Sequence, residues 1–232
     1  MSKVVFDIET IGCDFEVDLD AVQKEYLLKN AKSEEEIFAI KEGLGLYPVT
    51  GKIVTIAMHN IESGKGAVFY TPCEGDFEKK EFEEDGAKYI ACNEKEILEK
   101  FWNAIKRYKV YITFNGRAFD IPFIRIRSAI LDVECAIELM TPRYRNGYKL
   151  NPHVDLLEEL TFAGALNRKF NLDFYCKAFG IPSPKSSVNG HEVPKMIKEG
   201  RGLDVAKYSY GDVKATAKLF EKLNNSFRIQ GC

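Results

Sequence analysis

Cysteine is sparse and poorly placed for metal binding: the sequence of 232 residues has six cysteines, and none form a C-x-x-C pair. A zinc site built on paired cysteines is therefore not expected, and the chain is too long for a small disulfide scaffold. No apolar run approaches the ~20 residues of a membrane-spanning helix, and the first residues, MSKVVFDIET, contain no apolar signal region. We therefore expect a cytoplasmic protein with reduced thiols and no membrane association.

An excess of charge of either sign is also missing. The chain has 33 Lys and Arg against 35 Asp and Glu, a net charge of −2. This balance neither requires nor excludes a nucleic-acid partner, because the distribution of charge matters more than its total. Hydrophobic residues make up 45% and charged residues 29%, which is typical of a globular protein. The length suits one domain over residues 1–232 with a substantial buried core.

The sequence does contain alternating strand and helix patterns. Short runs rich in Val, Ile, Phe and Tyr predict strands at 3–9, 51–60, 65–71 and 109–114. Helical patterns occur at 16–45, 93–108, 153–160, 171–180 and 203–223. Strands come early and alternate with helices later, which indicates the α/β class.

Local signals fix several of the expected helix ends. Ser33 with Glu36 predicts a capping box, and Gly43 predicts the end of that helix. Asn93 is expected to cap the amphipathic helix that follows it. Gly211 weakens the expected C-terminal helix locally, because glycine is a poor helix former.

Two carboxylates stand within the first predicted strand, VVFDIETIG. Residues i and i+2 of a strand face the same side, so Asp7 and Glu9 project together. The simplest alternative is a strand end whose carboxylates are solvated. If the strand is buried, unpaired carboxylates are very costly and need a compensating cation. Two oxygen donors on one face suit a hard cation such as Mg²⁺ or Mn²⁺.

Two further acids each have an ordinary structural explanation. Asp120 follows the strand and turn of ITFNGRAFD, where an acid satisfies the free amides of a helix start. Pro122 suits the first turn of that helix. Tyr208 and Asp212, in YSYGDV, are four residues apart and share one face of a helix. An ordinary amphipathic helix with one surface Asp is the alternative for this pair.

Taken in order, the motifs D-x-E, N-x-x-x-F-D and Y-x-x-x-D resemble those of the DEDD superfamily of 3'→5' exonucleases, in the branch with a tyrosine in the last motif. More closely, the sequence resembles stand-alone exonucleases related to the proofreading domain of family-B DNA polymerases. The resemblance covers most of the chain, including GKIVTIA, HVDLLEEL, FGIP and VAKYSYGDV. It implies a ribonuclease-H-like fold, with a mixed five-stranded sheet flanked by helices. Residues near 14–45 and 73–92 depart from the family pattern and are expected to be insertions. Members of the related branch have His five residues before the last Asp, where this sequence has Lys207.

The resemblance also implies four metal-binding catalytic acids and a tyrosine that orients the attacking water. The acids are Asp7, Glu9, Asp120 and Asp212, and the tyrosine is Tyr208. The acids are expected to hold two divalent cations, Mg²⁺ or Mn²⁺, about 3.5–4 Å apart. In this arrangement Asp7 bridges both ions, and Glu9 with Asp212 completes the site of the ion that activates water.

Substrate contacts are expected beside these motifs and in a basic, aromatic loop at 143–151, where rings would stack on bases and cations would meet phosphates. The expected residues are Thr10, Asn115, Phe119, Arg143, Tyr144 and Arg145. A solvated loop explains residues 143–151 equally well, and Phe119 is as compatible with a core position. His153 and Asp155 are expected to cap and support the site by hydrogen bonds, and a metal-binding role is the alternative for this pair.

The function that these features favour is a metal-dependent 3'→5' exonuclease that acts on single-stranded DNA or unpaired 3' ends and releases nucleoside 5'-monophosphates. An RNA-trimming enzyme of the same fold is an alternative, because no residue here decides between the two sugars. A non-catalytic nucleic-acid-binding module is a second alternative, against which the presence of all four acids and Tyr208 argues. His59 and His191 are interpreted as structural. A polymerase or repair partner is left open.

Overall fold

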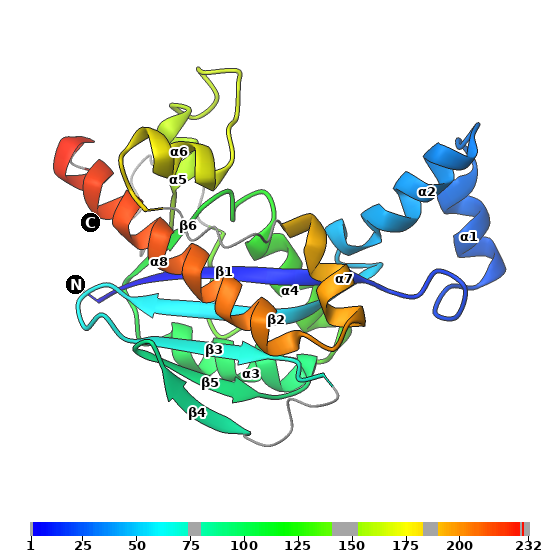
Figure 1. Ribbon diagram of the computed structural model, residues 1–232, viewed down its shortest axis with the longest axis horizontal. Coiled ribbons are helices and arrows are strands. Elements are labelled where there is room, and N and C mark those ends of the chain that lie inside the picture. The colour runs from blue at the N-terminus through cyan, green and yellow to red at the C-terminus, as the bar shows by residue number, and fades with distance from the viewer. Residues whose placement is uncertain (1, 74–79, 141–152, 183–189, 228, 230–232) are drawn as a thin grey trace.

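A seven-stranded mixed sheet forms the centre of the protein, in the order β4-β5-β3-β2-β1-β6-β7 (Figure 1). The computed structural model describes residues 2–73, 80–140, 153–182, 190–227 and 229. The strands are β1 (Lys3–Gly12), β2 (Gly51–Asn60), β3 (Gly66–Tyr70), β4 (Glu81–Glu84), β5 (Ala87–Ala91), β6 (Val110–Thr113) and β7 (His153–Asp155). The sheet has seven strands, not the five expected, because residues 81–91 form β4 and β5 and extend it beyond β3.

Helices cover both faces of the sheet, with α8 on one side and α3 and α4 on the other (Figure 1). They are α1 (Ala21–Leu28), α2 (Glu34–Glu42), α3 (Glu94–Ile105), α4 (Asp120–Ile130), α5 (Leu156–Leu160), α6 (Leu172–Ala178), α7 (Val193–Lys198) and α8 (Gly202–Phe227), with short 3-10 turns η1 (Gly43–Leu46) and η3 (Gly190–Glu192). The expected α/β class is confirmed. No helix in the described ranges is long and apolar enough to cross a membrane.

The central strand β1 sorts its side chains between two cores. Val4, Phe6 and Ile8 pack on the side of α3 and α4, whereas Val5 packs on the side of α8. Because strand side chains alternate, Asp7 and Glu9 follow Val5 and face α8. β1 pairs antiparallel with β2 from Val4 to Gly12 and parallel with β6 only from Lys3 to Val5, so β2 holds the stretch that carries Asp7 and Glu9.

The local helix signals are largely confirmed. Ser33 caps α2 by accepting from the Glu36 N–H at 3.2 Å, but the Glu36 carboxylate accepts from Lys32 N at 2.6 Å and not from Ser33. Asn93 caps α3 in a full capping box. α8 runs without a break through Gly211, because its apolar face is packed on the sheet.

Part of the expected secondary structure at 153–160 is wrong. His153–Asp155 is not helical but forms β7, which pairs in parallel with β6. Asp155 then caps α5 by accepting from Leu157 N at 3.0 Å. Strand and helix thus meet within a single apolar stretch, and a short apolar run does not reveal by itself which of the two it adopts. Residues 143–151 lie outside the described residues.

Residues 13–46 form a projecting unit, which we call the arm, built from α1, α2 and η1 (Figure 1). It contains most of the segment expected to be an insertion. Its own small core consists of Phe15, Leu19 and Leu44, and no residue of α1 or α2 is buried. The arm therefore depends on its attachment to the sheet for its position.

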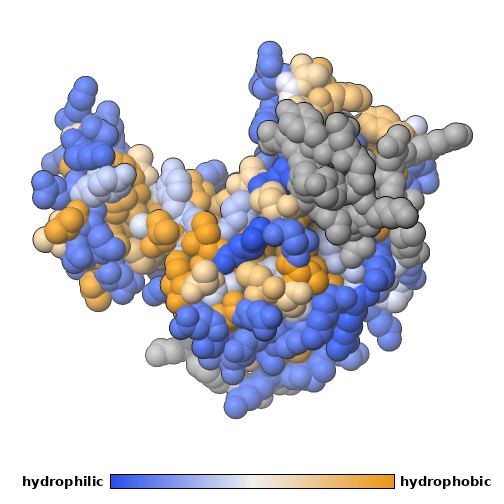
Figure 2. Space-filling view, turned by 180° about the vertical axis from the view of Figure 1, so that it is seen from behind, coloured by the Kyte–Doolittle hydropathy of each residue, from blue (hydrophilic) through white to orange (hydrophobic). Residues whose placement is uncertain are grey.

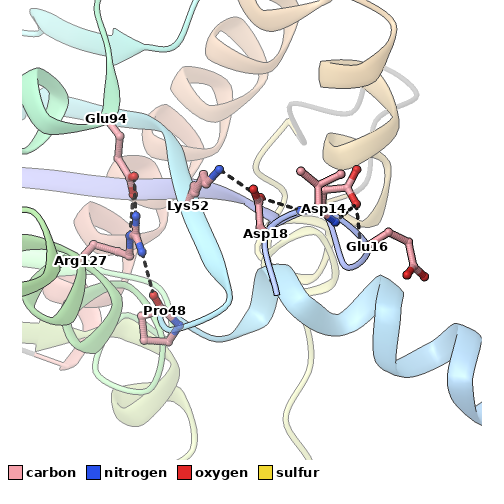
Figure 3. Close-up of polar contacts among 8 residues, drawn as sticks. Asp14, Glu16, Asp18, Pro48, Lys52, Glu94 and Arg127 are labelled. Atoms are coloured by element: carbon pink, nitrogen blue, oxygen red, sulfur yellow. Dashed lines mark hydrogen bonds and ion pairs between the residues drawn. The ribbon is translucent and has the colours of Figure 1, made fainter. Parts of the chain in front are cut away.

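A buried ion pair holds the segment that connects the arm to β2 (Figure 3). Arg127 donates to both carboxylate oxygens of Glu94, at 2.8 and 2.7 Å, and to the Pro48 carbonyl at 3.3 Å. Glu94 also accepts from Ile53 N at 2.8 Å. The side chains of Arg127 and Glu94 are only 10% and 15% exposed, so each charge relies on the other.

Removing one partner of this pair should be strongly destabilising. Arg127→Leu leaves the Glu94 charge buried without compensation, and we expect a loss of about 3–5 kcal/mol in the free energy of unfolding, measured in urea. Arg125→Leu is the matched control on the same helix, since Arg125 pairs with Glu138 at 2.7 Å in an exposed position. That change should alter stability by less than ~1 kcal/mol. Equal effects of the two substitutions would contradict a structural role for the buried pair.

Candidate active site

Four acids from three distant segments meet at one end of the sheet. Asp7 and Glu9 lie on β1. Because β6 runs parallel to β1, the carboxyl ends of both strands lie at the same end of the sheet. The chain beyond β6 leads to Asp120, the first residue of α4. Asp212 comes from α8, which crosses the face toward which Asp7 and Glu9 point.

Burial and mutual repulsion dominate the electrostatics of these acids. Burial raises the pKa of Asp7 well above its usual range, and Asp120, Glu9 and Asp212 raise it further. Burial likewise raises the pKa of Glu9, which is 9% exposed, with smaller contributions from Asp212 and Asp120. Asp120 is 3% exposed, and burial raises its pKa to about 7. This occurs even though its carboxylate accepts from Ile8 N at 3.1 Å.

The turn before α4 has a specific backbone conformation that aims Asp120 at β1. Asn115 adopts a left-handed conformation with φ 65°, and a Cβ at Gly116 would lie 2.4 Å from Thr113 Oγ1, so only glycine fits there. Asp155 fixes this turn by accepting from Asn115 N and Arg117 N, both at 2.9 Å. The capping expected of Asp155 is confirmed, and it also joins β7 to this turn.

His153 supports the same turn from the buried side. Its ring nitrogen Nε2 lies 2.8 Å from Thr113 Oγ1, and the residue is 3% exposed. Burial, with a smaller contribution from Arg117, lowers the pKa of His153 to about 3, so the ring is neutral at physiological pH. This position suits a hydrogen-bonding support.

Tyr208 stands one helical turn before Asp212, and its hydroxyl hydrogen-bonds the Asp212 side chain. Burial raises the pKa of Tyr208 far above its ordinary value, and the nearby Asp212 and Glu9 raise it further. The phenol therefore stays protonated at any physiological pH, which makes it a hydrogen-bond donor and not a base.

A cavity of about 700 Å³ opens beside these acids, and of the four only Glu9 and Asp212 line it. Its lining comprises Ile8, Glu9, Thr10, Ala39, Glu42, Gly43, Gly45, Leu46, Phe119, Asn171, Leu172, Asp173, Gly190, His191, Pro194, Tyr208 and Asp212. Its size lies within the range of roughly 300–1,000 Å³ typical of small-molecule sites. The arm contributes one part of the wall, and α6, η3 and α7 contribute another.

Some of the residues expected to bind substrate line the cavity, and others do not. Thr10 and Phe119 line the cavity, and the Phe119 ring also lies 5.5 Å from that of Phe123 at the edge of the core. Asn115 is not among the lining residues, since it shapes the turn instead. Arg143, Tyr144 and Arg145 lie outside the described residues.

Several lining residues were missed from the sequence. His191 was interpreted as structural, but it is exposed and lines the cavity with Tyr208 and Asp212. His59 does have a structural contact, with its Nδ1 3.1 Å from the Tyr210 hydroxyl. Leu46 and Glu42 of the arm also line the cavity. No sequence signal marks these positions, because the fold alone brings them to the site.

The donor chemistry of the four acids fits hard divalent cations. All are carboxylates, the ligands that Mg²⁺ and Mn²⁺ prefer. In the described part of the chain, the charges that shift the pKa values of Asp7 and Glu9 are all carboxylates, so no protein cation offsets them. No three His, Cys, Asp or Glu side chains of the described residues are already gathered around one point where an ion would sit. Ligation would therefore require these side chains to turn toward a common point.

The fold and the buried acids define a ribonuclease-H-like domain of the type found in DNA polymerases. The chain belongs to the family of predicted 3'-5' exonucleases related to the exonuclease domain of PolB, whose family model matches residues 52–227. That match includes Asp120, Tyr208 and Asp212 and begins after β1.

Similar proteins are DNA polymerases of archaea. The polymerase of Desulfurococcus sp. (strain Tok) is 33% identical over 144 residues, 54% of this chain and 18% of that protein, and that of Thermococcus gorgonarius is 30% identical over 148 residues, 56% and 18%. The family B DNA polymerase from Pyrobaculum calidifontis superimposes with a TM-score of 0.59 at 18% identity, over 96% of this chain and 24% of that one. This chain therefore corresponds to less than a quarter of the relatives' length.

The electrostatics predict that removing a buried acid stabilises the metal-free protein. A carboxyl whose pKa is higher in the folded than in the unfolded state destabilises the folded protein when it is ionised. This effect is absent below the unfolded-state pKa and complete above the folded-state pKa. In EDTA at pH 8, Asp7→Asn should therefore raise the free energy of unfolding, on the order of 1–3 kcal/mol. This difference from wild type should shrink as the pH falls toward 5, because the wild-type carboxyl then binds a proton.

The control for this measurement is Asp132→Asn. Asp132 is exposed and has φ 54°, a conformation that Asn also tolerates. Its substitution should leave the stability unchanged across the same pH range. His153 also makes the stability depend on pH, but it is present in wild type and in both variants. Its contribution therefore cancels when each variant is compared with wild type. If Asp7→Asn instead lowers the stability at pH 8 in EDTA, Asp7 is not an uncompensated buried charge.

Proposed function

We propose that this protein is a metal-dependent 3'→5' exonuclease that removes nucleoside 5'-monophosphates from single-stranded DNA or unpaired 3' ends. The observation that carries the proposal is the electrostatic coupling of Asp7 and Glu9 to Asp120 and Asp212 beside a cavity that Glu9 and Asp212 line, with every pKa-shifting charge on Asp7 and Glu9 a carboxylate. Burying like charges together is very unfavourable unless a cation compensates them. The membership of a family of predicted 3'-5' exonucleases supports the direction of attack.

The four acids would hold two divalent cations, with Asp7 bridging, Glu9 and Asp212 on one ion and Asp120 on the other. When bound, such cations would polarise the phosphodiester and acidify a water molecule. Asp120 is held by the N–H of Ile8 and its own N–H, so one oxygen is committed to the backbone and its direction is fixed. The rigid backbone of β1 keeps Asp7 and Glu9 on the same face.

Tyr208 would act by orienting the attacking water, the role that the resemblance to the tyrosine branch of the DEDD exonucleases implies for it. Its hydroxyl donates to Asp212 and lies among acids, and its raised pKa excludes a role as general base. Phe119 and Leu172 give the cavity apolar surfaces for the terminal base, and Thr10 borders Glu9. The Thr10 hydroxyl is occupied, since it donates to Gly45 O at 2.7 Å.

DNA is the favoured substrate because the similar proteins are DNA polymerases. The chain would work as one exonuclease domain over residues 1–232. Whether it acts with a polymerase or repair partner is a separate proposal that the cavity does not address, because the cavity recognises only the end of a strand.

The polarity and the metal requirement are tested together with labelled oligonucleotides. A 5'-labelled single strand should give a ladder of shortening products in Mg²⁺ or Mn²⁺, and none in excess EDTA. A 3'-labelled strand should release the label as a mononucleotide at once, and a 3'-phosphate should slow attack. Matched RNA and DNA strands measure sugar preference.

Three outcomes would contradict the proposal. Full activity in excess EDTA would exclude the metal requirement. Cutting of a circular strand as fast as a linear one would show an endonuclease. Faster degradation of RNA than of DNA would move the substrate to the alternative considered from the sequence.

Tyr208→Phe removes one hydroxyl and keeps the ring and all four acids. We expect a 10- to 1000-fold loss in single-turnover rate, ~1.4–4 kcal/mol of barrier, since only the positioning of water is lost. Asp212→Asn should be clearly worse, because it removes a proposed metal ligand. Tyr108→Phe, in the connection before β6, is the matched control and should keep the wild-type rate. A wild-type rate for Tyr208→Phe would leave Tyr208 as a packed helix residue only.

A further inference from the structure

The arm differs in charge from the rest of the chain. Residues 13–46 contain nine Asp and Glu against four Lys, a net charge of −5, whereas the remaining residues contain 26 acidic and 29 basic residues, a net charge of +3. Two of the arm's lysines are already paired, since Lys24 and Lys41 both contact Glu16, at 3.5 and 2.8 Å. The arm is therefore a poor surface for a phosphate backbone.

The root of the arm nevertheless forms part of the cavity wall. Ala39, Glu42, Gly43, Gly45 and Leu46 line the cavity together with Glu9 and Tyr208. The arm stands apart from the body across a notch, and apolar side chains gather near its base (Figure 2). Whatever enters the cavity thus passes beside an acidic projection.

The root is fixed and cannot easily swing aside. Gly12 at the end of β1 and Gly45 approach so closely that a Cβ at Gly45 would lie 2.9 Å from Gly12 N. Thr10 donates to Gly45 O at 2.7 Å, and Cys13 N donates to Thr50 O at 2.7 Å. Lys52 of β2 pairs with Asp18 at 3.5 Å (Figure 3). The arm therefore keeps its position relative to β1.

We propose that the arm excludes the complementary strand and so restricts the site to unpaired 3' ends. This inference rests on the proposed function. A duplex carries about one negative charge per 1.7 Å of its axis, and its second strand would meet the acidic arm while the first strand occupied the cavity. Repulsion acts within about 8 Å at physiological salt, so Glu42 at the wall acts directly and the rest of the arm acts mainly by its bulk.

Two variants separate the arm from the chemistry. Because the chain leaves and returns at Gly12 and Gly45, residues 14–43 can be replaced by a short Gly-Ser linker. The milder double variant Glu42→Gln/Leu46→Ala changes only exposed side chains at the wall, so it should fold even if the excised protein does not. Glu83→Gln, exposed on β4 at the far edge of the sheet, is the matched charge control.

Binding is measured by fluorescence anisotropy in EDTA, on a single strand, a blunt duplex and a duplex with an unpaired 3' overhang. Wild type should prefer the single strand and the overhang over the blunt duplex. Excision should reduce that preference at least 10-fold, chiefly by tighter duplex binding, and the double variant should shift it 2- to 5-fold in the same direction. Glu83→Gln should leave it unchanged. In Mg²⁺, the relative rates on blunt and overhanging ends should follow the same order.

The results distinguish this inference from the proposed function. If wild type degrades no substrate but its binding preference still depends on the arm, the proposed exonuclease fails and the strand exclusion stands. If folded variants keep the wild-type preference, the arm does not exclude a strand, and its exposed Val22, Tyr26 and Phe38 serve another purpose. If the variants lose single-strand binding while duplex binding is unchanged, the arm holds the substrate and the inference is wrong.

Discussion

The main physical constraint on this structure is the repulsion among four neighbouring carboxylates, of which Glu9 and Asp120 are buried and Asp7 and Asp212 are half-buried. Burial raises the pKa of Asp7, Glu9 and Asp120. Asp120 and Asp212 add to the rise at both Asp7 and Glu9. A fold can tolerate such a cluster only if its surroundings are rigid and well packed. Here β1 is paired with β2 along the stretch that carries Asp7 and Glu9, and it lies between two apolar cores, which offset the unfavourable charges. The carboxylates thus destabilise the fold at the place where the proposed chemistry needs negative charge.

The geometry of the cluster follows from how few degrees of freedom its supports have. Because β1 and β6 are parallel, Asp7 and the turn after β6 lie at the same end of the sheet. Asp155 and Gly116 fix that turn, and the turn fixes the start of α4 at Asp120. α8 then needs only its apolar face to bring Asp212 and Tyr208 over β1. Side chains that seem distant in sequence are therefore joined by a short chain of backbone constraints.

The sequence predicts the elements that carry the candidate site residues better than it predicts the extent of the sheet. The spacing of Asp7 and Glu9, the helix start at Asp120 and the helical pair Tyr208 and Asp212 rest on local periodicity, and the structure has them on the expected elements. β7 was missed because three residues are too few to show a period, and β4 because its acidic sequence, EFEE, resembles a loop. β5, with the sequence AKYIA, was not recognised as a strand. The position of His191 in the cavity depends entirely on tertiary packing. Features that depend on residues within one helix or strand could be predicted from the sequence, whereas contacts between helices and strands could not.

The two segments expected to be insertions lie at places with different consequences. β4 and β5 extend the edge beyond β3, with two strands between them and β1, so they enlarge the sheet without approaching the acids. The arm instead leaves β1 directly after the strand that carries Glu9 and returns beside it through Gly45. A segment inserted at that strand end must border the cavity, because the carboxyl end of β1 carries Glu9 and Thr10, which line it. The same number of residues inserted elsewhere would change the size of the molecule, whereas here they change what can reach its site.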